Sequence, residues 1–341
     1  MTENLSTIIP KLADRRILVL GDVILDEYIT GKAQRMSREA PIPVLEFQSR
    51  QHIPGGASNP ASNIVALGSA ALQIGIVGED DTAQHLQDAL QGRGIDTSGL
   101  ITCAEKPTTL KTRILAQMGL RFPQQVARVD TLSRSEIDPA TEAKVLAIVQ
   151  QNLVNADALL VSDYRNGLLT KSLVNAVRER AQSTNVPLFA DAQGSLEKYR
   201  GFDLVKCNAD DAAEILRRDL HTDTDFAEAA TELCKAHELR GAMVITRGGD
   251  GATVATVAGE MVHIPAPRVS AVYDTVGAGD TWIAVATLAR IAGADFRDAV
   301  RLANYASGIV VQHLGNYTPS PDELLGAVTE RQWEQWMLAQ R

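Results

Sequence analysis

The sequence has little cysteine and no long apolar run. Its three cysteines, Cys103, Cys207 and Cys234, lie far apart and form no C-x-x-C pair. This spacing argues against a structural zinc site and suits buried thiols in a reducing compartment. The longest apolar stretch, residues 282–289, is far shorter than the ~20 residues that span a bilayer. Since the first residues also lack a signal-peptide pattern, we expect a cytoplasmic protein with no membrane partner.

Basic clusters are absent as well. The formal net charge is -9, and Lys and Arg form no run. Because affinity for a nucleic-acid backbone depends on clustered cations, we expect no nucleic-acid partner, although a small anionic substrate needs only a few cations placed locally. Internal repeats, low-complexity tracts and Gly/Ser linkers are also missing. The 341 residues therefore favour a single domain, 1–341, with a substantial core.

Predicted strands and helices alternate along the chain. The apolar run 17–20 ends at Gly21 and Asp22, which is the pattern of a central parallel strand. This alternation predicts an α/β fold, a three-layer α/β/α sandwich whose mostly parallel central sheet carries helices on both faces. Ligands bind such sheets beyond the carboxyl ends of the strands. The other predicted strands are 158–161, 187–190, 204–205 and 243–245, and the predicted helices are 142–153, 171–183, 210–217 and 225–236.

Two parts of the chain do not follow this alternation. Residues 41–47 contain two prolines, which suits an edge strand. Residues 108–116 and 125–130 alternate apolar and polar side chains, as half-exposed strands do. We interpret these stretches as a small β-sheet lid, formed by segments of approximately 27–50 and 108–130, that excludes water from a neighbouring cleft.

One motif combines the features of an anion site with a carboxylate. The string Asp274-Thr-Val-Gly-Ala-Gly-Asp280 directly precedes a predicted helix over 281–290. The first N–H groups of a helix attract anions, and small residues let a phosphate approach the backbone. An aspartate at this point is explained if Asp280 takes a proton from a hydroxyl that attacks a phosphoryl group. The alternative is that Asp280 is an ordinary helix N-cap.

With this motif the sequence resembles the ribokinase-like (PfkB) sugar kinases. D-T followed by G-A-G-D looks like their second signature, and Pro54-Gly-Gly-Ala-Ser-Asn59 resembles their first. The resemblance implies a ribokinase-like fold, phosphoryl transfer from ATP, and pairing of two copies through the lid. It also implies that the N–H groups of Gly277, Ala278 and Gly279 hold the transferring phosphoryl group. The sugar would be bound by Gly55, Gly56 and Asn59.

The resemblance extends over nearly the whole chain. Asp22 looks like a substrate-binding aspartate, and Asn208-Ala-Asp-Asp211 resembles an N-x-x-E motif that helps place Mg²⁺, although its final Glu is Asp here. Asp274 would support a monovalent cation such as K⁺. The residues that resemble the nucleotide side of the family are Thr246, Arg247, Gly248, Gly251 and, for the adenine, Asn304.

A narrower resemblance is to the D-glycero-D-manno-heptose 7-phosphate kinases of lipopolysaccharide biosynthesis. It rests on residues 35–44, 162–167 and 272–281, and it adds Asp163 to the substrate-binding residues. The implied reaction phosphorylates the anomeric C1 hydroxyl and gives the 1,7-bisphosphate on the route to ADP-heptose. The chain carries no H-x-G-H motif and so resembles the stand-alone kinase form.

Two lysines of this narrower pattern are missing. D-Y-x-K-G reads Asp163-Tyr-Arg-Asn-Gly167, and D-P-K-G reads Asp191-Ala-Gln-Gly194. Arg165 is positioned in the sequence to compensate for the first loss, whereas nothing in the sequence accounts for the second.

A substrate that already carries a 7-phosphate needs cations far from C1. Lys111 and Arg113 stand at i and i+2 of a predicted lid strand and so point to one face, with Arg128 on the paired segment. The alternative is that these side chains form a solvated charged surface.

Other functions stay open at this point. A kinase for a hexose phosphate or a nucleoside keeps the same fold. A non-catalytic regulator that binds a sugar or a nucleotide is suggested by Asp211 and the missing lysines. A nicotinamide-dependent oxidoreductase is excluded because no G-x-G-x-x-G turn follows the first strand. No Walker A motif and no protein-kinase signature set occur either.

Overall fold

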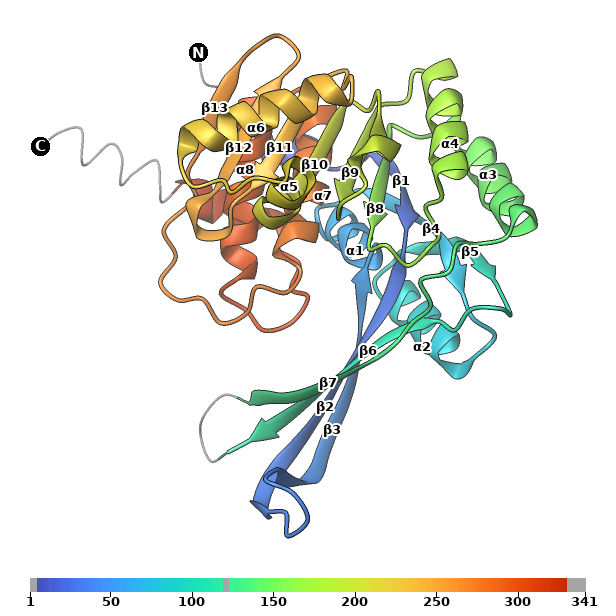
Figure 1. Ribbon diagram of the computed structural model, residues 1–341, viewed down its shortest axis with the longest axis vertical. Coiled ribbons are helices and arrows are strands. Elements are labelled where there is room, and N and C mark those ends of the chain that lie inside the picture. The colour runs from blue at the N-terminus through green and yellow to red at the C-terminus, as the bar shows by residue number, and fades with distance from the viewer. Residues whose placement is uncertain (1–4, 119–122, 330–341) are drawn as a thin grey trace, which may run out of the picture.

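Short apolar runs form the strands of a large central sheet (Figure 1), as the sequence predicts. The computed structural model describes residues 5–118 and 123–329. The order in the large sheet is β13-β12-β11-β10-β9-β8-β1-β4-β5, and only the pairings of β12 with β11 and with β13 are antiparallel. Its strands are β1 (Arg16–Gly21), β4 (Ala70–Val77), β5 (Asp96–Thr102), β8 (Ala158–Asp163), β9 (Leu188–Ala192), β10 (Leu204–Asn208), β11 (Ala242–Thr246), β12 (Ala252–Thr256) and β13 (Met261–Ile264).

Helices cover both faces of this sheet, which confirms the predicted three layers. In β1, Ile17 and Val19 pack against one helical layer and Leu18 and Leu20 against the other, because successive side chains of a strand alternate between faces. One layer contains α1 (Ser58–Ala66), α2 (Asp81–Gln91), α7 (Ala278–Ile291) and α8 (Phe296–Val310), and the other contains α3 (Pro139–Leu153), α4 (Lys171–Ser183), α5 (Ala209–Leu216) and α6 (Asp223–Ala236). Short 3₁₀ turns occupy Leu5–Thr7, Ile9–Leu12, Leu196–Tyr199 and Gly248–Asp250.

Helix α7 lies in the interior of the protein. Every residue from 280 to 289 is buried, including the apolar stretch that begins at Trp282. A helix that is apolar all round must be covered on all sides, and α7 packs against both α1 and α8. The motif at its amino terminus is therefore held on a rigid element. None of the helices that the structure describes combines the length and apolarity of a membrane span.

The second sheet projects from the main body as a long ribbon (Figure 1). Its order is β3-β2-β6-β7, so the proline-containing strand lies at an edge, as predicted. The strands are β2 (Val23–Met36), β3 (Pro43–Gly56), β6 (Thr109–Gln117) and β7 (Gln124–Thr131). Residues 119–122 of the predicted lid lie outside the described residues.

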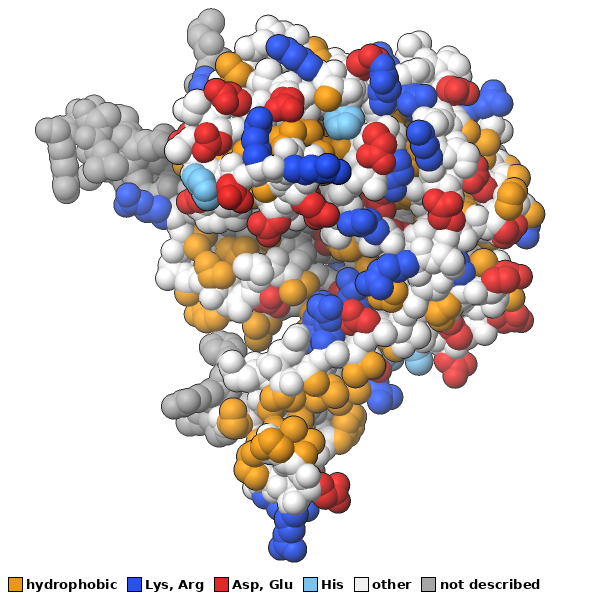
Figure 2. Space-filling view, viewed as in Figure 1, with side chains coloured by type: hydrophobic (Ala, Val, Ile, Leu, Met, Phe, Trp, Pro, Cys, Tyr) orange, Lys and Arg blue, Asp and Glu red, His pale blue; other side chains and the backbone are white. Residues whose placement is uncertain are grey.

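The lid begins closer to the main sheet than the predicted start near residue 27. Val23 already pairs with Gly56, directly after the end of β1. At this root Val23, Ile24, Leu25 and Asp26 are all buried, so the alternation that marks a half-exposed strand is absent. Further out β3 is exposed on both faces, β7 is exposed along its whole length, and the lid exposes apolar side chains, among them Phe47 at 63% of its surface. Figure 2 shows these hydrophobic side chains gathered on the projecting sheet.

The three cysteines are free thiols and all are buried, as expected from the sequence. A single domain over 1–341 stays a prediction.

Candidate active site

The predicted anion site lies at the amino terminus of α7. Gly277 is the N-cap with a φ of 80°, a conformation that favours glycine. A Cβ at this position would lie 2.5 Å from Asn59 Nδ2, so a side chain is excluded sterically as well. The N–H groups of the first helical turn lack partners within the helix, and this turn contains Ala278, Gly279 and Asp280.

Asp280 is held by two side chains from other parts of the chain. Its Oδ1 accepts a hydrogen bond from the Tyr164 hydroxyl at 2.5 Å, and its Oδ2 accepts one from Asn59 Nδ2 at 3.0 Å. The alternative that Asp280 is the helix N-cap is wrong, because Gly277 occupies that position. The carboxylate is therefore held in a fixed orientation at the amino-terminal end of α7.

The surroundings of Asp280 favour a carboxyl group that titrates near neutrality. Only 6% of the residue is exposed. Burial, followed by the charge of Asp191, raises the pKa of Asp280 to about 6, although hydrogen bonds from Tyr164 and Asn59 act in the opposite direction. General bases work best when their pKa lies close to the working pH, so this environment suits proton abstraction.

Asp22 supports the loop that carries Tyr164. Its Oδ2 accepts hydrogen bonds from the backbone N–H groups of Tyr164 at 2.9 Å and Asn166 at 3.1 Å. Burial, and then the neighbouring Asp163 carboxylate, raises the pKa of Asp22 to about 6. The substrate-binding role predicted for Asp22 stays a prediction, and the observed contacts make it a residue that positions Tyr164.

Asp163 is engaged within the protein. It is 2% exposed, accepts a hydrogen bond from the Tyr199 hydroxyl at 2.5 Å and forms an ion pair with Lys198. The backbone N–H of Arg165 donates a further hydrogen bond to Asp163 Oδ1 at 2.8 Å. The predicted contact between Asp163 and a substrate stays a prediction.

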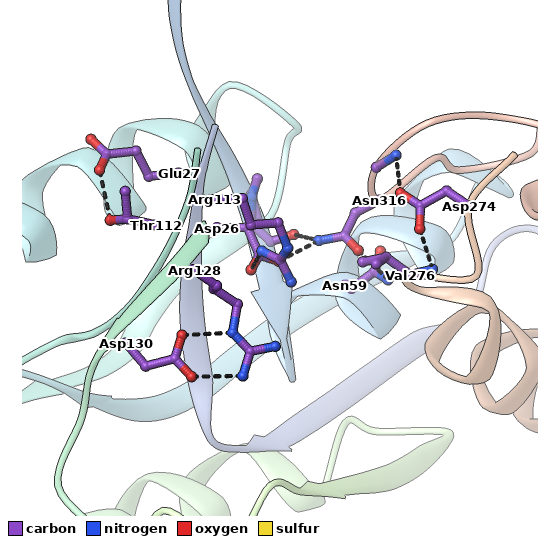
Figure 3. A network of polar contacts seen from close by, with 12 residues as sticks. Asp26, Glu27, Asn59, Thr112, Arg113, Arg128, Asp130, Asp274, Val276 and Asn316 are labelled. Carbon is purple, nitrogen blue, oxygen red and sulfur yellow. Dashed lines mark hydrogen bonds and ion pairs between the residues drawn. The ribbon is translucent and has the colours of Figure 1, made fainter. Parts of the chain in front are cut away.

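Two further residues of the site, Asp26 and Asn316, were not singled out from the sequence (Figure 3). Asp26 forms an ion pair with Arg113, and its other oxygen accepts a hydrogen bond from Asn316 Nδ2 at 2.8 Å. Asn316 Nδ2 also donates to the Pro54 carbonyl at 3.1 Å, and Asn316 Oδ1 accepts a hydrogen bond from Asn59 Nδ2 at 3.5 Å. The signal for Asp26 was a carboxylate directly after the apolar run Val23-Ile-Leu25; Asn316 carried no such signal.

The first signature, residues 54–59, lies against this network. Gly55 and Gly56 pair with Ile24 and Val23 at the root of the lid. A Cβ at Gly55 would lie 2.1 Å from Asp26 Oδ2, so glycine is required for this close approach. Lid, first signature and second signature thus meet at one place.

The three predicted lid cations differ in how their charges are balanced. Lys111 Nζ lies 5.3 Å from the centre of the Tyr164 ring and has no carboxylate within ion-pair distance among the residues the structure describes. Arg113 is paired with Asp26, and Arg128 is held at 2.9 Å by both oxygens of Asp130 (Figure 3). Lys111 is therefore the lid cation left to meet an anionic ligand.

On the nucleotide side, β10 and β11 bring Asn208 and Thr246 together as register partners. The Asn208 side chain caps α5 by accepting the N–H of Asp211 at 2.7 Å. Asp211 Oδ2 is buried with no hydrogen-bond partner in the described part of the chain. Burial raises the pKa of Asp211. A buried oxygen of this kind fits a hard cation or its bound water.

Arg247 points away from this pair. Its guanidinium lies 4.2 Å from the centre of the Phe226 ring and forms an ion pair with Asp223 at 2.6 Å. Gly248 and Gly251 close the turn that follows, through a hydrogen bond between Gly251 N–H and the Gly248 carbonyl at 3.1 Å.

Asn304 lies at a pocket between β13 and α8. Its side chain accepts a hydrogen bond from Trp282 Nε1 at 2.8 Å and donates to the Ile264 carbonyl at 3.0 Å. The adenine contact predicted for Asn304 stays a prediction.

Asp274 connects the loop before α7 to the loop after α8. It accepts the N–H of Val276 at 3.0 Å and that of Gly315 at 2.9 Å (Figure 3). Because Gly315 precedes Asn316, this contact fixes the loop that delivers Asn316 to the site.

Comparison with solved structures identifies the fold. The chain is similar to Arabidopsis thaliana ribokinase complexed with ribose and ATP, with a TM-score of 0.70 and 18% identity over 93% of this chain and 99% of that one. It is also similar to Escherichia coli phosphofructokinase-2 in complex with substrates and products, with a TM-score of 0.74, 18% identity and the same coverage. The fold is therefore ribokinase-like, as predicted.

The sequence identifies the family. The profile of the pfkB family carbohydrate kinases matches residues 14–323, so the chain belongs to this family and is a sugar kinase, a phosphotransferase. Among curated proteins, the bifunctional protein HldE of Geotalea uraniireducens is 35% identical over 327 residues, which cover 96% of this chain and 65% of HldE. HldE of Geobacter sulfurreducens is 36% identical over 312 residues, 91% of this chain and 62% of that protein. The chain thus spans less than two thirds of these relatives.

Proposed function

We propose that this kinase transfers the γ-phosphoryl group of ATP to the anomeric C1 hydroxyl of D-glycero-D-manno-heptose 7-phosphate. The product is the 1,7-bisphosphate, on the route to ADP-heptose and lipopolysaccharide core. Two observations support this proposal: the 35% identity with HldE over almost the whole of this chain, and the position beside Tyr164 of Lys111, which forms no ion pair with the described residues. Buried free thiols suit the reducing cytoplasm, where we place the reaction.

The observation that carries the proposal is the position of Asp280 at the amino terminus of α7. In the proposed reaction its carboxylate accepts the proton of the sugar hydroxyl, while the oxygen attacks the γ-phosphorus and ADP leaves. The N–H groups of Gly277, Ala278 and Gly279, together with the positive end of the helix dipole, stabilise the charge on the transferring group. Asn59 and Tyr164 orient the carboxylate.

Lys111 is proposed to bind the 7-phosphate. It stands on β6 in the lid, and burial lowers its pKa, so a bound phosphate dianion stabilises its charged form. Arg113 helps less, because it already shares its charge with Asp26. The sequence offered Lys111 and Arg113 as the clamp, with Arg128 as a further candidate; we propose that Lys111 carries this role beside the Arg113–Asp26 ion pair.

Mg²⁺ is proposed to bind through Asp211, whose buried unpartnered oxygen suits a cation or its bound water. When bound, the metal neutralises the charge of the nucleotide phosphates. For K⁺ the support is weaker, because both oxygens of Asp274 already accept backbone N–H groups.

We also propose a homodimer that forms through the lid. The outer lid exposes several large apolar side chains, and exposed apolar patches mark protein contacts. The sheet edges at β3 and β7 offer backbone groups for pairing.

The test is ADP release with Mg-ATP and a panel of acceptors: the heptose 7-phosphate, fructose 6-phosphate, ribose and adenosine. We expect turnover that is strongest with the heptose 7-phosphate. Faster turnover with another member of the panel would overturn the proposed substrate and keep the kinase.

A further inference from the structure

A buried lysine lies directly beneath the first turn of α7. Lys206 on β10 stands opposite Asp191 on the parallel strand β9, and its Nζ lies 2.8 Å from both oxygens of that carboxylate. A Cβ at Gly279 would lie 2.9 Å from Lys206 Nζ, which shows how closely the ammonium approaches the helix. The residue is 6% exposed.

The ammonium group retains donor capacity at this position. It has three N–H donors, of which Asp191 takes two. No third acceptor lies within hydrogen-bond distance among the residues that the structure describes. Although burial lowers the pKa of Lys206, the charges of Asp191 and then of Asp280 raise it above its ordinary value, so the side chain stays cationic.

We propose that Lys206 completes the anion hole of α7, with its third N–H donating to an oxygen of the transferring phosphoryl group. Asp191 is the positioning residue that holds the ammonium beneath Gly279. The lysine of D-P-K-G, which Gln193 replaces, is then supplied in this chain from the neighbouring strand.

The proton of Lys206 is not consumed in this step. The sugar oxygen forms the new bond to phosphorus and its proton passes to Asp280, while the bond between the γ-phosphorus and the bridging oxygen breaks and the electron pair leaves with ADP. Lys206 stabilises the negative charge that spreads over the phosphoryl oxygens. The proposal rests on the kinase activity and not on which sugar is used.

The opposing possibility is that Lys206 serves only as a counter-ion for Asp191. Removing one partner of a buried pair leaves an uncompensated charge, whereas replacing both by neutral residues is often tolerated. The informative comparison is therefore the wild type with the double variant Asp191→Asn/Lys206→Met, which removes the ion pair without leaving a buried charge. Asp191→Asn alone is measured beside them, because it removes the carboxylate that positions the ammonium and helps to keep it charged.

Turnover of the wild type and both variants is measured by ADP release at saturating Mg-ATP and heptose 7-phosphate. The pH is chosen on the alkaline plateau, where titration of Asp280 does not contribute. Thermal unfolding of each protein is recorded alongside. If the wild type does not use the heptose phosphate, the proposed substrate fails and the comparison is made with the acceptor from the panel that it does use.

We expect kcat of the double variant to fall about 10²-fold below that of the wild type, the size seen when one donor of an oxyanion hole is removed. The KM for the sugar should stay within about threefold, because Lys206 acts on the transition state rather than on sugar binding. A folded double variant that matches the wild type in kcat overturns the proposal and leaves Lys206 as a counter-ion. So does a loss confined to the KM for the sugar.

Discussion

The hydrogen bond between Tyr164 and Asp280 makes the pH dependence of the enzyme predictable. It stabilises the carboxylate and so lowers the pKa of Asp280, which burial and Asp191 otherwise raise. Tyr164→Phe keeps the ring beneath Lys111 and removes only the hydroxyl. The pKa of Asp280 should therefore rise, and the acidic limb of activity should move to higher pH.

The size of this shift can be estimated. A hydrogen bond to a charged group contributes about 1.5–3 kcal/mol, and one pKa unit corresponds to about 1.4 kcal/mol, so the limb should move by roughly 1–2 units. From a starting pKa of about 6, the ionised fraction at pH 7 falls from about nine tenths to between about half and one tenth. At pH 7, kcat/KM should fall about two- to tenfold, and it should recover on the alkaline plateau.

The assay is kcat/KM from about pH 5 to 9, which reports ionisations of the free enzyme and free substrate. A sugar phosphate also titrates near pH 6, but this contribution is the same for both proteins and cancels when their profiles are divided. Tyr199→Phe is the matched control, since it removes a buried hydroxyl that bonds to Asp163 instead. Superimposable acidic limbs for Tyr164→Phe and wild type would refute the assignment of Asp280 as the base.

Three further predictions concern the base, the phosphate contact and the lid. Asp280→Asn should fold but lose about 10²–10⁴-fold in kcat, measured by ADP release, because the carboxylate that accepts the proton is gone; a variant with most of its turnover contradicts this role. Lys111→Met should raise the KM for the heptose 7-phosphate at least tenfold with a smaller change in kcat. Arg128→Met should change this KM little, because the Arg128 side chain is exposed and paired with Asp130. Equal effects of the two substitutions would contradict the assignment of Lys111 as the phosphate ligand. Phe47→Glu should shift the protein from dimer to monomer in sedimentation, since it places a charge on the exposed apolar lid; an unchanged mass would place any dimer contact elsewhere.

The sequence alone was enough to predict the fold class, the central strands β1, β8, β9, β10 and β11 and the helices α3 to α7, whereas β4, β5, β12, β13, α1 and α2 were not predicted. Buried strands showed as short apolar runs that end at Gly or Asp, and the glycine-containing motif preceded a helix directly. These signals are local, because each depends on residues within a few positions of one another. The predicted helix over 281–290 lies within α7, which begins three residues earlier at Ala278, and the predicted lid strands are β6 and β7.

Only the tertiary structure decided which side chains share the site. Asn316 reaches Asp26 across 290 positions, and Tyr164 reaches Asp280 across 116. No local pattern encodes these contacts, since they depend on how the loops at the carboxyl ends of the strands converge. The same reason explains why the ion pair of Arg113, a candidate phosphate ligand in the sequence, with Asp26 was not predicted. The parallel sheet and the root of the lid bring these residues together. Their spacing along the chain does not predict that they are in contact.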